Sequence, residues 1–132
     1  MSDQVEAQIV RHQDPLMLPP STSVMEAARH MHARHVRAVL VIEGDADLVG
    51  IFTERDAISR VLAAGRDPVT TILADVMTNN PETVTRQQTA TEMLWLMKEV
   101  RVRHLPVVQD GKTVGIVVRN DFPDLAAGGP PG

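Results

Sequence analysis

The feature that most constrains the fold of this chain is an internal repeat. Shifting the sequence by 66 positions aligns residues of the same or similar type, namely Pro15 with Pro81, Ser23 with Thr89, Glu26 with Glu92 and Met31 with Met97. After one deletion in the second copy the offset becomes 65, which aligns Val49, Gly50, Ile51 and Asp56 with Val114, Gly115, Ile116 and Asp121. The 132 residues therefore contain two versions of a unit of about 55 residues, and neither version alone has enough apolar surface for a secure core.

Each copy begins with a predicted amphipathic helix. A capping-box pattern opens the helix at 23–26 and again at 89–92, since Ser or Thr is followed three residues later by Glu. Apolar residues then recur at the i, i+3, i+4, i+7 spacing of a one-faced helix, namely Val24, Ala27, Ala28 and Met31, and Ala90, Met93, Leu94 and Met97. Both helices are therefore expected to pack against another element.

Two short β-rich runs follow each helix. In the first copy they cover 38–42 and 48–52 around an acidic, glycine-containing turn, and in the second copy 105–108 and 114–118 around Asp110 and Gly111. These patterns predict two strand pairs. After Thr53 a further helix is expected to carry Ala57, Ile58, Val61 and Leu62 on one face and to end near Gly65.

The expected fold class is α+β, a tandem pair of βαββα repeats. We expect two small three-stranded sheets flanked by helices and related by pseudo-twofold symmetry. The predicted boundaries are an N-terminal segment at 1–13, repeat 1 at 14–65, a connector at 66–76 with a brief helix over 71–76, repeat 2 at 77–125 and a disordered tail at 126–132.

Composition excludes several kinds of protein. Aromatic residues make up 2% and the formal net charge is −4, which opposes the stacking platforms and the basic surface that nucleic-acid binding requires. The absence of cysteine excludes disulfides, thiolate metal sites and cysteine catalysis. No apolar run could span a bilayer and the N-terminus lacks a signal-peptide pattern, so we expect a cytoplasmic protein without a membrane partner.

Catalytic and metal-binding patterns receive little support. The sequence has no Walker loop, no nucleophile motif and no paired acids in a recognisable site, so an enzyme is the least supported class and no catalytic cofactor is expected. His30, His32 and His35 crowd one helix end, but a third ligand is not evident on one side of that helix. Surface histidines are favoured over a metal site.

The most informative segment is Gly50 to Asp56, where a predicted strand turns into a helix. Free backbone N–H groups at such a junction suit an anion. Thr53 can donate its hydroxyl to a phosphate oxygen, and Asp56 can accept both hydroxyls of a ribose. The same two residues also fit a purely structural role as an N-cap and its capping-box partner, and the residues alone favour that simpler interpretation.

Several motifs together resemble the paired CBS domain, or Bateman module, from about Asp14 to Leu125. They are the Gly-x-x-Thr-x-x-Asp element at 50–56, Val76-Met77-Thr78 followed by Pro81, and Arg103-His104-Leu105-Pro106-Val107-Val108 before the second hairpin. The resemblance, to a small stand-alone bacterial or archaeal type, implies a cytoplasmic regulatory module for signal transduction that binds AMP, ATP, S-adenosylmethionine or NAD in a cleft between the repeats. An adenine nucleotide would then be a regulatory ligand.

The resemblance also implies roles for individual residues. Asp56 would contact the ribose, Thr53 the ribose or phosphate, and Ile51, Val76, Met77 and Thr78 the adenine. Arg103 and His104 would supply charge to the phosphate. Arg55 is also expected to belong to the ligand-binding site.

The second copy departs from this pattern. It keeps a ribose-type acid at Asp121 but has Val118 where a hydroxyl is expected, so its cleft is the weaker candidate. Helices with apolar faces that extend beyond one sheet favour a homodimer, with an unidentified protein partner that senses the ligand-bound state. The rival interpretation is a ligand-free structural module that serves dimerisation or interaction.

Overall fold

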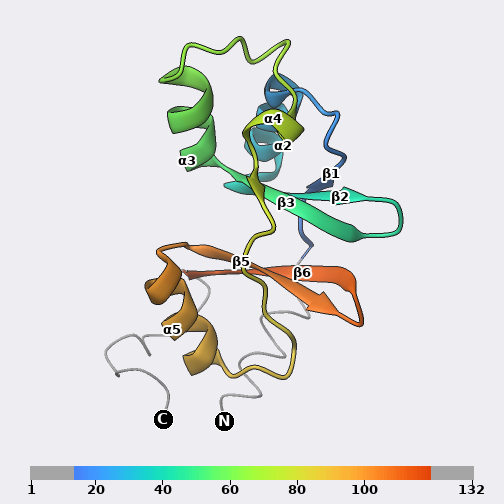
Figure 1. Ribbon diagram of the computed structural model, residues 1–132, viewed down its shortest axis with the longest axis vertical. Coiled ribbons are helices and arrows are strands. Elements are labelled where there is room, and N and C mark those ends of the chain that lie inside the picture. The colour runs from blue at the N-terminus through green and yellow to red at the C-terminus, as the bar shows by residue number, and fades with distance from the viewer. Residues whose placement is uncertain (1–13, 120–132) are drawn as a thin grey trace. The chain divides into compact units, whose positions relative to one another are not determined.

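The computed structural model describes residues 14–119, which divide into two compact units (Figure 1). The first unit is Pro15–Pro81, and the second comprises Asp14 together with the described residues from Glu82 onward. The connector predicted at 66–76 lies within the first unit. The N-terminal segment, the disordered tail and the candidate residue Asp121 lie outside the described residues.

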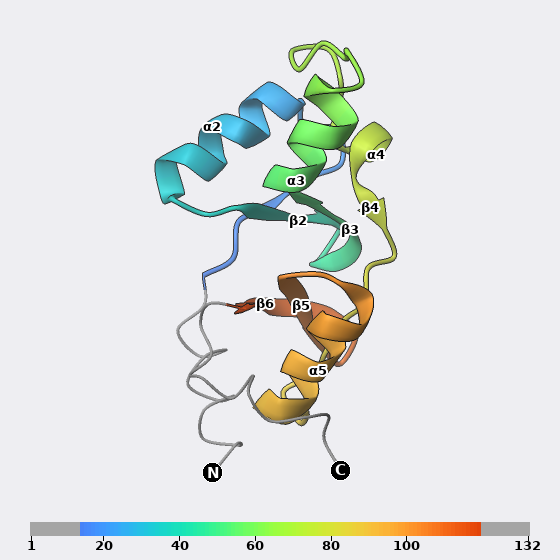
Figure 2. The ribbon, with the colours of Figure 1, turned by 90° about the vertical axis from the view of Figure 1, so that its left-hand side faces the viewer.

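The first unit is built on a four-stranded sheet in the order β1-β2-β3-β4. Its strands are β1 (Met17–Leu18), β2 (Ala38–Glu43), β3 (Asp47–Thr53) and β4 (Thr78–Asn79). β1 runs parallel to β2, whereas β2 pairs antiparallel with β3 and β3 pairs antiparallel with β4. The helices of this unit cover one face of the sheet (Figure 2).

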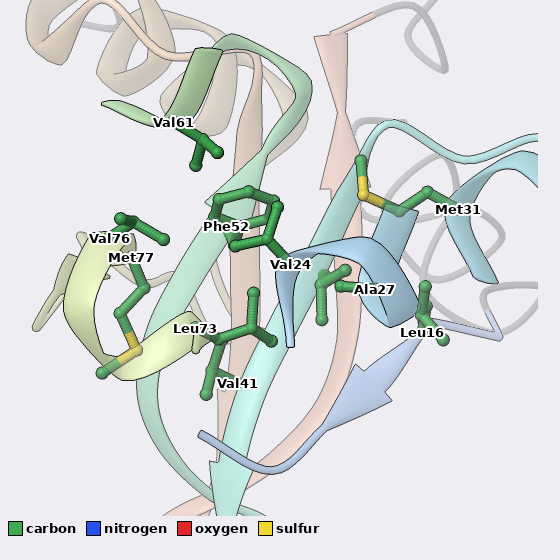
Figure 3. Packing of buried hydrophobic residues seen from close by; sticks show 11 residues of the cluster. Leu16, Val24, Ala27, Met31, Val41, Phe52, Val61, Leu73, Val76 and Met77 are labelled. Carbon is green, nitrogen blue, oxygen red and sulfur yellow. The ribbon is translucent and has the colours of Figure 1, made fainter. Parts of the chain in front are cut away.

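Four helical segments complete the first unit: α2 (Val24–Arg34), α3 (Glu54–Asp56), the π-helical segment η1 (Ala57–Leu62) and α4 (Leu73–Val76). Their buried side chains meet those of the sheet in one apolar cluster, to which Phe52 of β3 and Leu73 of α4 contribute with no exposed surface. Figure 3 shows these side chains converging from β2, β3, α2, α4 and η1. Since neighbouring strand residues alternate between faces, Leu40 and Ile51 lie on the face of the sheet opposite Phe52.

The connector belongs to the first unit because it satisfies the N–H groups at the start of α2. The N–H of Val24 donates to the Thr71 carbonyl at 2.9 Å, and the N–H of Met25 donates to the Pro68 carbonyl at 2.9 Å. The N–H of Glu26 donates to the Ser23 hydroxyl at 3.1 Å. These N–H groups would otherwise be without partners at a helix start, and the connector supplies the acceptor for two of the three, so it acts as part of the helix cap.

One expectation about the helix after Thr53 is wrong. Val61 is fully buried, but Ile58 is 55% exposed and Leu62 is 66% exposed, so the four apolar residues do not share a buried face. The backbone is π-helical here, with the N–H of Ala63 donating to the Ile58 carbonyl five residues earlier at 2.8 Å. In this segment the Val61 side chain packs into the core, whereas the side chains of Ile58 and Leu62 are exposed to solvent.

The second unit contains α5 (Ala90–Val100), β5 (His104–Gln109) and β6 (Lys112–Val118). β5 and β6 pair antiparallel, and α5 contributes its predicted face, Ala90, Met93, Leu94 and Met97, to a separate buried cluster. Val84 adds a single parallel bridge to Val107. The described sheets therefore have four strands and two strands rather than three each, while the predicted α+β class with small sheets flanked by helices is confirmed.

The two units repeat the same details at the predicted offsets. α2 and α5 have N-caps at Ser23 and Thr89, and both end on a residue with positive φ, 56° at His35 and 59° at Arg101. Each hairpin has a register shift, between Val41 and Ile42 and between Val107 and Val108. The deletion inferred from the sequence lies in the turn, which covers 44–46 in the first unit and 110–111 in the second.

Candidate functional site

The predicted site begins where β3 ends at Thr53 and α3 begins. Thr53 is the N-cap of α3, and its hydroxyl oxygen accepts a hydrogen bond from the Asp56 N–H at 3.2 Å. Asp56 Oδ2 accepts in return from the Thr53 N–H at 2.9 Å and lies 3.1 Å from the Thr53 hydroxyl, which can donate to it. The capping box weighed from the sequence is therefore formed, and it fixes both candidate ligand groups in one orientation.

Asp56 is nearly buried, which is unusual for a carboxylate. The residue is 8% exposed, and burial of this kind requires hydrogen-bonding or charged partners. Thr53 satisfies Oδ2, and Arg60 on η1 approaches the other oxygen, with Nε 3.6 Å from Oδ1. The Asp56 side chain keeps 12% of its surface exposed.

Arg60 connects this carboxylate to a second segment of the unit. Its Nη1 donates to the Met77 carbonyl at 3.1 Å and lies 3.4 Å from the Val76 carbonyl. Val76 is the last residue of α4 and Met77 its C-cap, so these carbonyls lack partners within the helix. Sequence reasoning missed Arg60, although its spacing of four residues from Asp56 is a signal for an ion pair on a helix.

The 76–79 segment lies directly beside β3. Thr78 pairs with Ile51 and Asn79 pairs with Gly50. A Cβ at Gly50 would lie 2.9 Å from the Thr78 carbonyl oxygen and 2.9 Å from Met77 Cγ, and closer still to Met77 Sδ. Gly50 is therefore needed for close approach of two backbones, a role that the motif alone did not reveal.

The structure brings together most of the residues predicted for the site. Within the first unit these are Ile51, Thr53, Asp56, Val76, Met77 and Thr78. The side chains of Val76 and Met77 are buried in the apolar cluster, so a ligand would meet this segment mainly through its backbone and Thr78. Arg55 is exposed on α3.

Arg103 and His104 belong to the second unit, where they lie at the start of β5. His104 pairs with Val118 at the end of β6, and the Arg103 carbonyl accepts from the Arg119 N–H at 2.8 Å. Arg103 is exposed and His104 is half-buried. They occupy the positions in the second unit that Arg37 and Ala38 occupy in the first, where Ala38 pairs with Thr53.

Three histidines, His30, His32 and His35, lie near the end of α2. Across residues 14–119, no group of three or more His, Cys, Asp or Glu side chains is arranged to hold a metal ion. His35 has a positive φ and closes α2 as its C-cap, a structural role. In the same range, no helix has the length and apolar character needed to cross a membrane.

The repeated units and this strand–helix junction are those of a known domain family. The family model "CBS domain" matches residues 5–63 and 73–125, so the chain belongs to the CBS-domain family and contains a pair of these domains. Domains of this family are typically regulatory rather than catalytic.

Similar proteins include a plant relative and two solved structures. The CBS domain-containing protein CBSCBSPB3 of Arabidopsis thaliana is 41% identical over 102 residues, which are 77% of this chain and 18% of that protein. The chain thus spans less than a fifth of the length of this relative. A putative signal-transduction protein with CBS domains from Burkholderia ambifaria has a TM-score of 0.81 at 32% identity, covering 87% of this chain and 88% of that one.

The second solved structure has bound ligands. It is the CBS domain pair of protein MJ0100, in complex with 5′-methylthioadenosine and S-adenosyl-L-methionine. Its TM-score is 0.75 at 25% identity, and the match covers 86% of this chain and 90% of that one.

Proposed function

We propose that this CBS pair is a regulatory module that binds an adenosyl ligand, of the class of AMP, ATP, NAD or S-adenosylmethionine, and changes conformation on binding. The observation that carries the proposal is the buried Asp56 carboxylate, held by Thr53 at a strand–helix junction beside the backbone of 76–78. The adenosyl ligands of the similar MJ0100 structure support this ligand class.

The chemistry of Asp56 suits a ribose. A carboxylate has about four lone-pair positions. Thr53 engages Oδ2, whereas among residues 14–119 the contact of Oδ1 is the long one to Arg60 Nε at 3.6 Å. Two adjacent hydroxyls could therefore donate to Oδ1 without breaking the helix cap, and charge-assisted hydrogen bonds of this kind are stronger than neutral ones.

The remaining groups of the ligand have candidate partners as well. Ile51 and Thr78 pair across β3 and β4 and are the proposed neighbours of the adenine, with Thr78 half-buried and Ile51 buried. Arg55, Arg103 and His104 are proposed to supply charge to the phosphate, or to an equivalent group. Asp121 is retained as a proposed ribose contact of the second repeat.

Ligand binding would regulate a partner through differential affinity. A ligand shifts a conformational equilibrium only as far as it binds the two states differently, and a protein partner that distinguishes those states would sense the change. The module needs no catalytic group of its own for this role.

A thermal-shift panel tests the proposal. We expect AMP, ADP, ATP, NAD or S-adenosylmethionine to raise the melting temperature, since a ligand at 100 times its Kd stabilises the native state by about 2.7 kcal/mol. Nucleotides lacking the 2′- and 3′-hydroxyls are the matched controls and should give a smaller shift. Failure of every adenosyl ligand to shift the wild-type protein would contradict the proposal and favour a ligand-free interaction module.

We also propose that the module is a homodimer. Ile58 and Leu62 are exposed one helical turn apart on η1, and Val69 in the connector is 62% exposed. Grouped exposed apolar side chains are typical of interaction surfaces, and Ile58 and Leu62 lie close enough on η1 to form such a group. Light scattering at micromolar concentration should give a dimer mass, and Leu62→Glu should shift it toward the monomer, whereas a monomeric wild type would contradict the proposal.

A further inference from the structure

The Arg60 side chain makes contacts that extend beyond a simple ion pair. It is 51% exposed, yet its guanidinium group reaches two separate parts of the first unit. Nε lies 3.6 Å from Asp56 Oδ1, and Nη1 is 3.1 Å from the Met77 carbonyl oxygen and 3.4 Å from that of Val76. One side chain therefore joins the candidate ribose carboxylate to the C-terminal end of α4.

The backbone that Arg60 holds is the segment that leads out of the unit. Met77 is followed by β4, whose Thr78 and Asn79 pair with Ile51 and Gly50, and the unit ends at Pro81. β4 has only two residues, so the strand pairing alone gives this segment little stability. Burial of Val76 and Met77 anchors the residues just before β4, and the charged donor on their carbonyls adds to this anchoring.

We propose that Arg60 is a positioning residue that couples the state of the Asp56 carboxylate to the position of the 76–79 backbone. Hydroxyls that donate to Asp56 Oδ1 would weaken the attraction between that oxygen and Arg60, and the guanidinium would then hold the carbonyls differently. The ligand-dependent part of this inference rests on the proposed function, whereas the coupling between Asp56 and 76–79 does not.

The geometry favours arginine over lysine at this position. The guanidinium presents several N–H groups in a fixed planar fork, so Nε and Nη1 can face different acceptors at the same time. The single ammonium of lysine would reach either the carboxylate or the carbonyls, but would hold both less well. Arg60→Lys should therefore retain the charge and lose most of the coupling.

Amide hydrogen exchange of 77–79 in the ligand-free protein tests the coupling. Arg60→Met should raise these exchange rates by about fivefold to tenfold, the range expected for losing one hydrogen bond from a charged donor at a half-exposed site. Asp56→Asn keeps an oxygen acceptor for the Thr53 N–H but removes the charge that attracts Arg60. It should raise the same rates, and Arg60→Met/Asp56→Asn should show no further increase beyond Arg60→Met.

Arg66→Met is the matched control, since Arg66 is exposed and its recorded contact is made by its backbone N–H, which donates to the Val61 carbonyl. It should leave exchange at 77–79 unchanged. The coupling is overturned if Asp56→Asn leaves these amides at wild-type rates, or if the effects of the two substitutions simply multiply. Full recovery in Arg60→Lys would overturn the role assigned to the planar fork.

The ligand arm uses AMP as the probe. AMP should change exchange at 77–79 in the wild type and in Arg66→Met, and this change should be lost in Arg60→Met even where AMP saturates the protein. An identical change in Arg60→Met would overturn the ligand-dependent part. If AMP fails to bind the wild type and the other adenosyl ligands also fail, the proposed function falls, while the ligand-free exchange cycle still decides whether Asp56 and 76–79 are coupled.

Discussion

The two units share a scaffold but differ at the end of the second hairpin strand. β3 ends at Thr53, whose hydroxyl caps α3 and orients Asp56. β6 ends at Val118, whose side chain has no polar group and cannot form such a cap. The N-cap positions and the hairpin bulges are otherwise repeated. The buried helix faces match at three of four positions, because Ala28 of α2 is exposed, contrary to the prediction, whereas its counterpart Leu94 of α5 is buried. The scaffold therefore depends on apolar spacing and helix capping, which both copies retain, while the candidate ligand chemistry depends on a few polar residues that one copy can lose.

The largest expected difference between the units concerns their cores. Phe52 is the largest fully buried side chain of the chain's described part, and Val117 holds the equivalent position in β6. Phe52→Ala should lower the free energy of unfolding by about 3 to 5 kcal/mol, as large-to-small core substitutions do. Val117→Ala should cost less, because it removes fewer buried carbons. Denaturant titrations measure both losses. If Val117→Ala lowered the free energy of unfolding as much as Phe52→Ala, the two positions would not be equivalent in their cores.

The close backbone contact at Gly50 provides a second test. Gly50→Ala should destabilise the protein by about 1 to 3 kcal/mol, because the new methyl group would overlap the Thr78 carbonyl and Met77. Gly111→Ala is the control in the other unit, where a Cβ would meet nothing within 4 Å and only the positive φ of 79° opposes it. A smaller loss of stability for Gly50→Ala than for Gly111→Ala would contradict the tight packing of β4 on β3.

Asp56 should influence ligand affinity more strongly than its neighbours do. Asp56→Ala should weaken binding of an adenosine nucleotide by about 1 to 3 kcal/mol through loss of charge-assisted hydrogen bonds. It should also cost about 1 kcal/mol of stability, because the helix cap is lost as well. Calorimetry at a temperature where the variant is folded measures the affinity, and an unchanged Kd would reject the site.

The smallest expected effects come from exchanging the residues that distinguish the two strands. Thr53→Val should weaken the first binding event by about 0.5 to 1.5 kcal/mol, and Val118→Thr should create or tighten a second one. If Thr53 serves only as a cap, Thr53→Val should lower stability by about 1 kcal/mol without changing affinity. Melting temperature and nucleotide stoichiometry, measured on both variants, separate these outcomes.

The sequence predicted those parts of the fold that local physics determines. The capping residues Ser23 and Thr89, the buried face of α5 and both hairpins have the expected positions, because each follows from short-range spacing. The pairing of Thr78 with Ile51 was not predicted, since a two-residue strand has no periodic pattern. The π-helical turn at η1 was also missed, because backbone hydrogen bonding changes there without a sequence signal.

The 50–56 and 76–78 segments of the candidate site were predicted, but the side-chain contacts that link them were not. Thr53 and Asp56 lie together as the 50–56 element indicated, and the recorded partner of the second Asp56 oxygen is Arg60, which lies outside that element. The need for glycine at position 50 arises from Met77 and Thr78, which are distant in sequence. Such requirements come from tertiary contacts that spacing within one segment cannot reveal.

The turn of the first hairpin has a practical consequence for experiments on this protein. Residues 44–46 stand where the second hairpin has only 110–111, and the pairing on both sides of the difference is the same. A length change at this tip therefore does not reverse which side chains face inward, as a register slip would. A short epitope, or a cysteine that carries a fluorophore, could be inserted after Asp45 as a reporter. Such an insertion should leave Gly50, Thr53 and Asp56 in place.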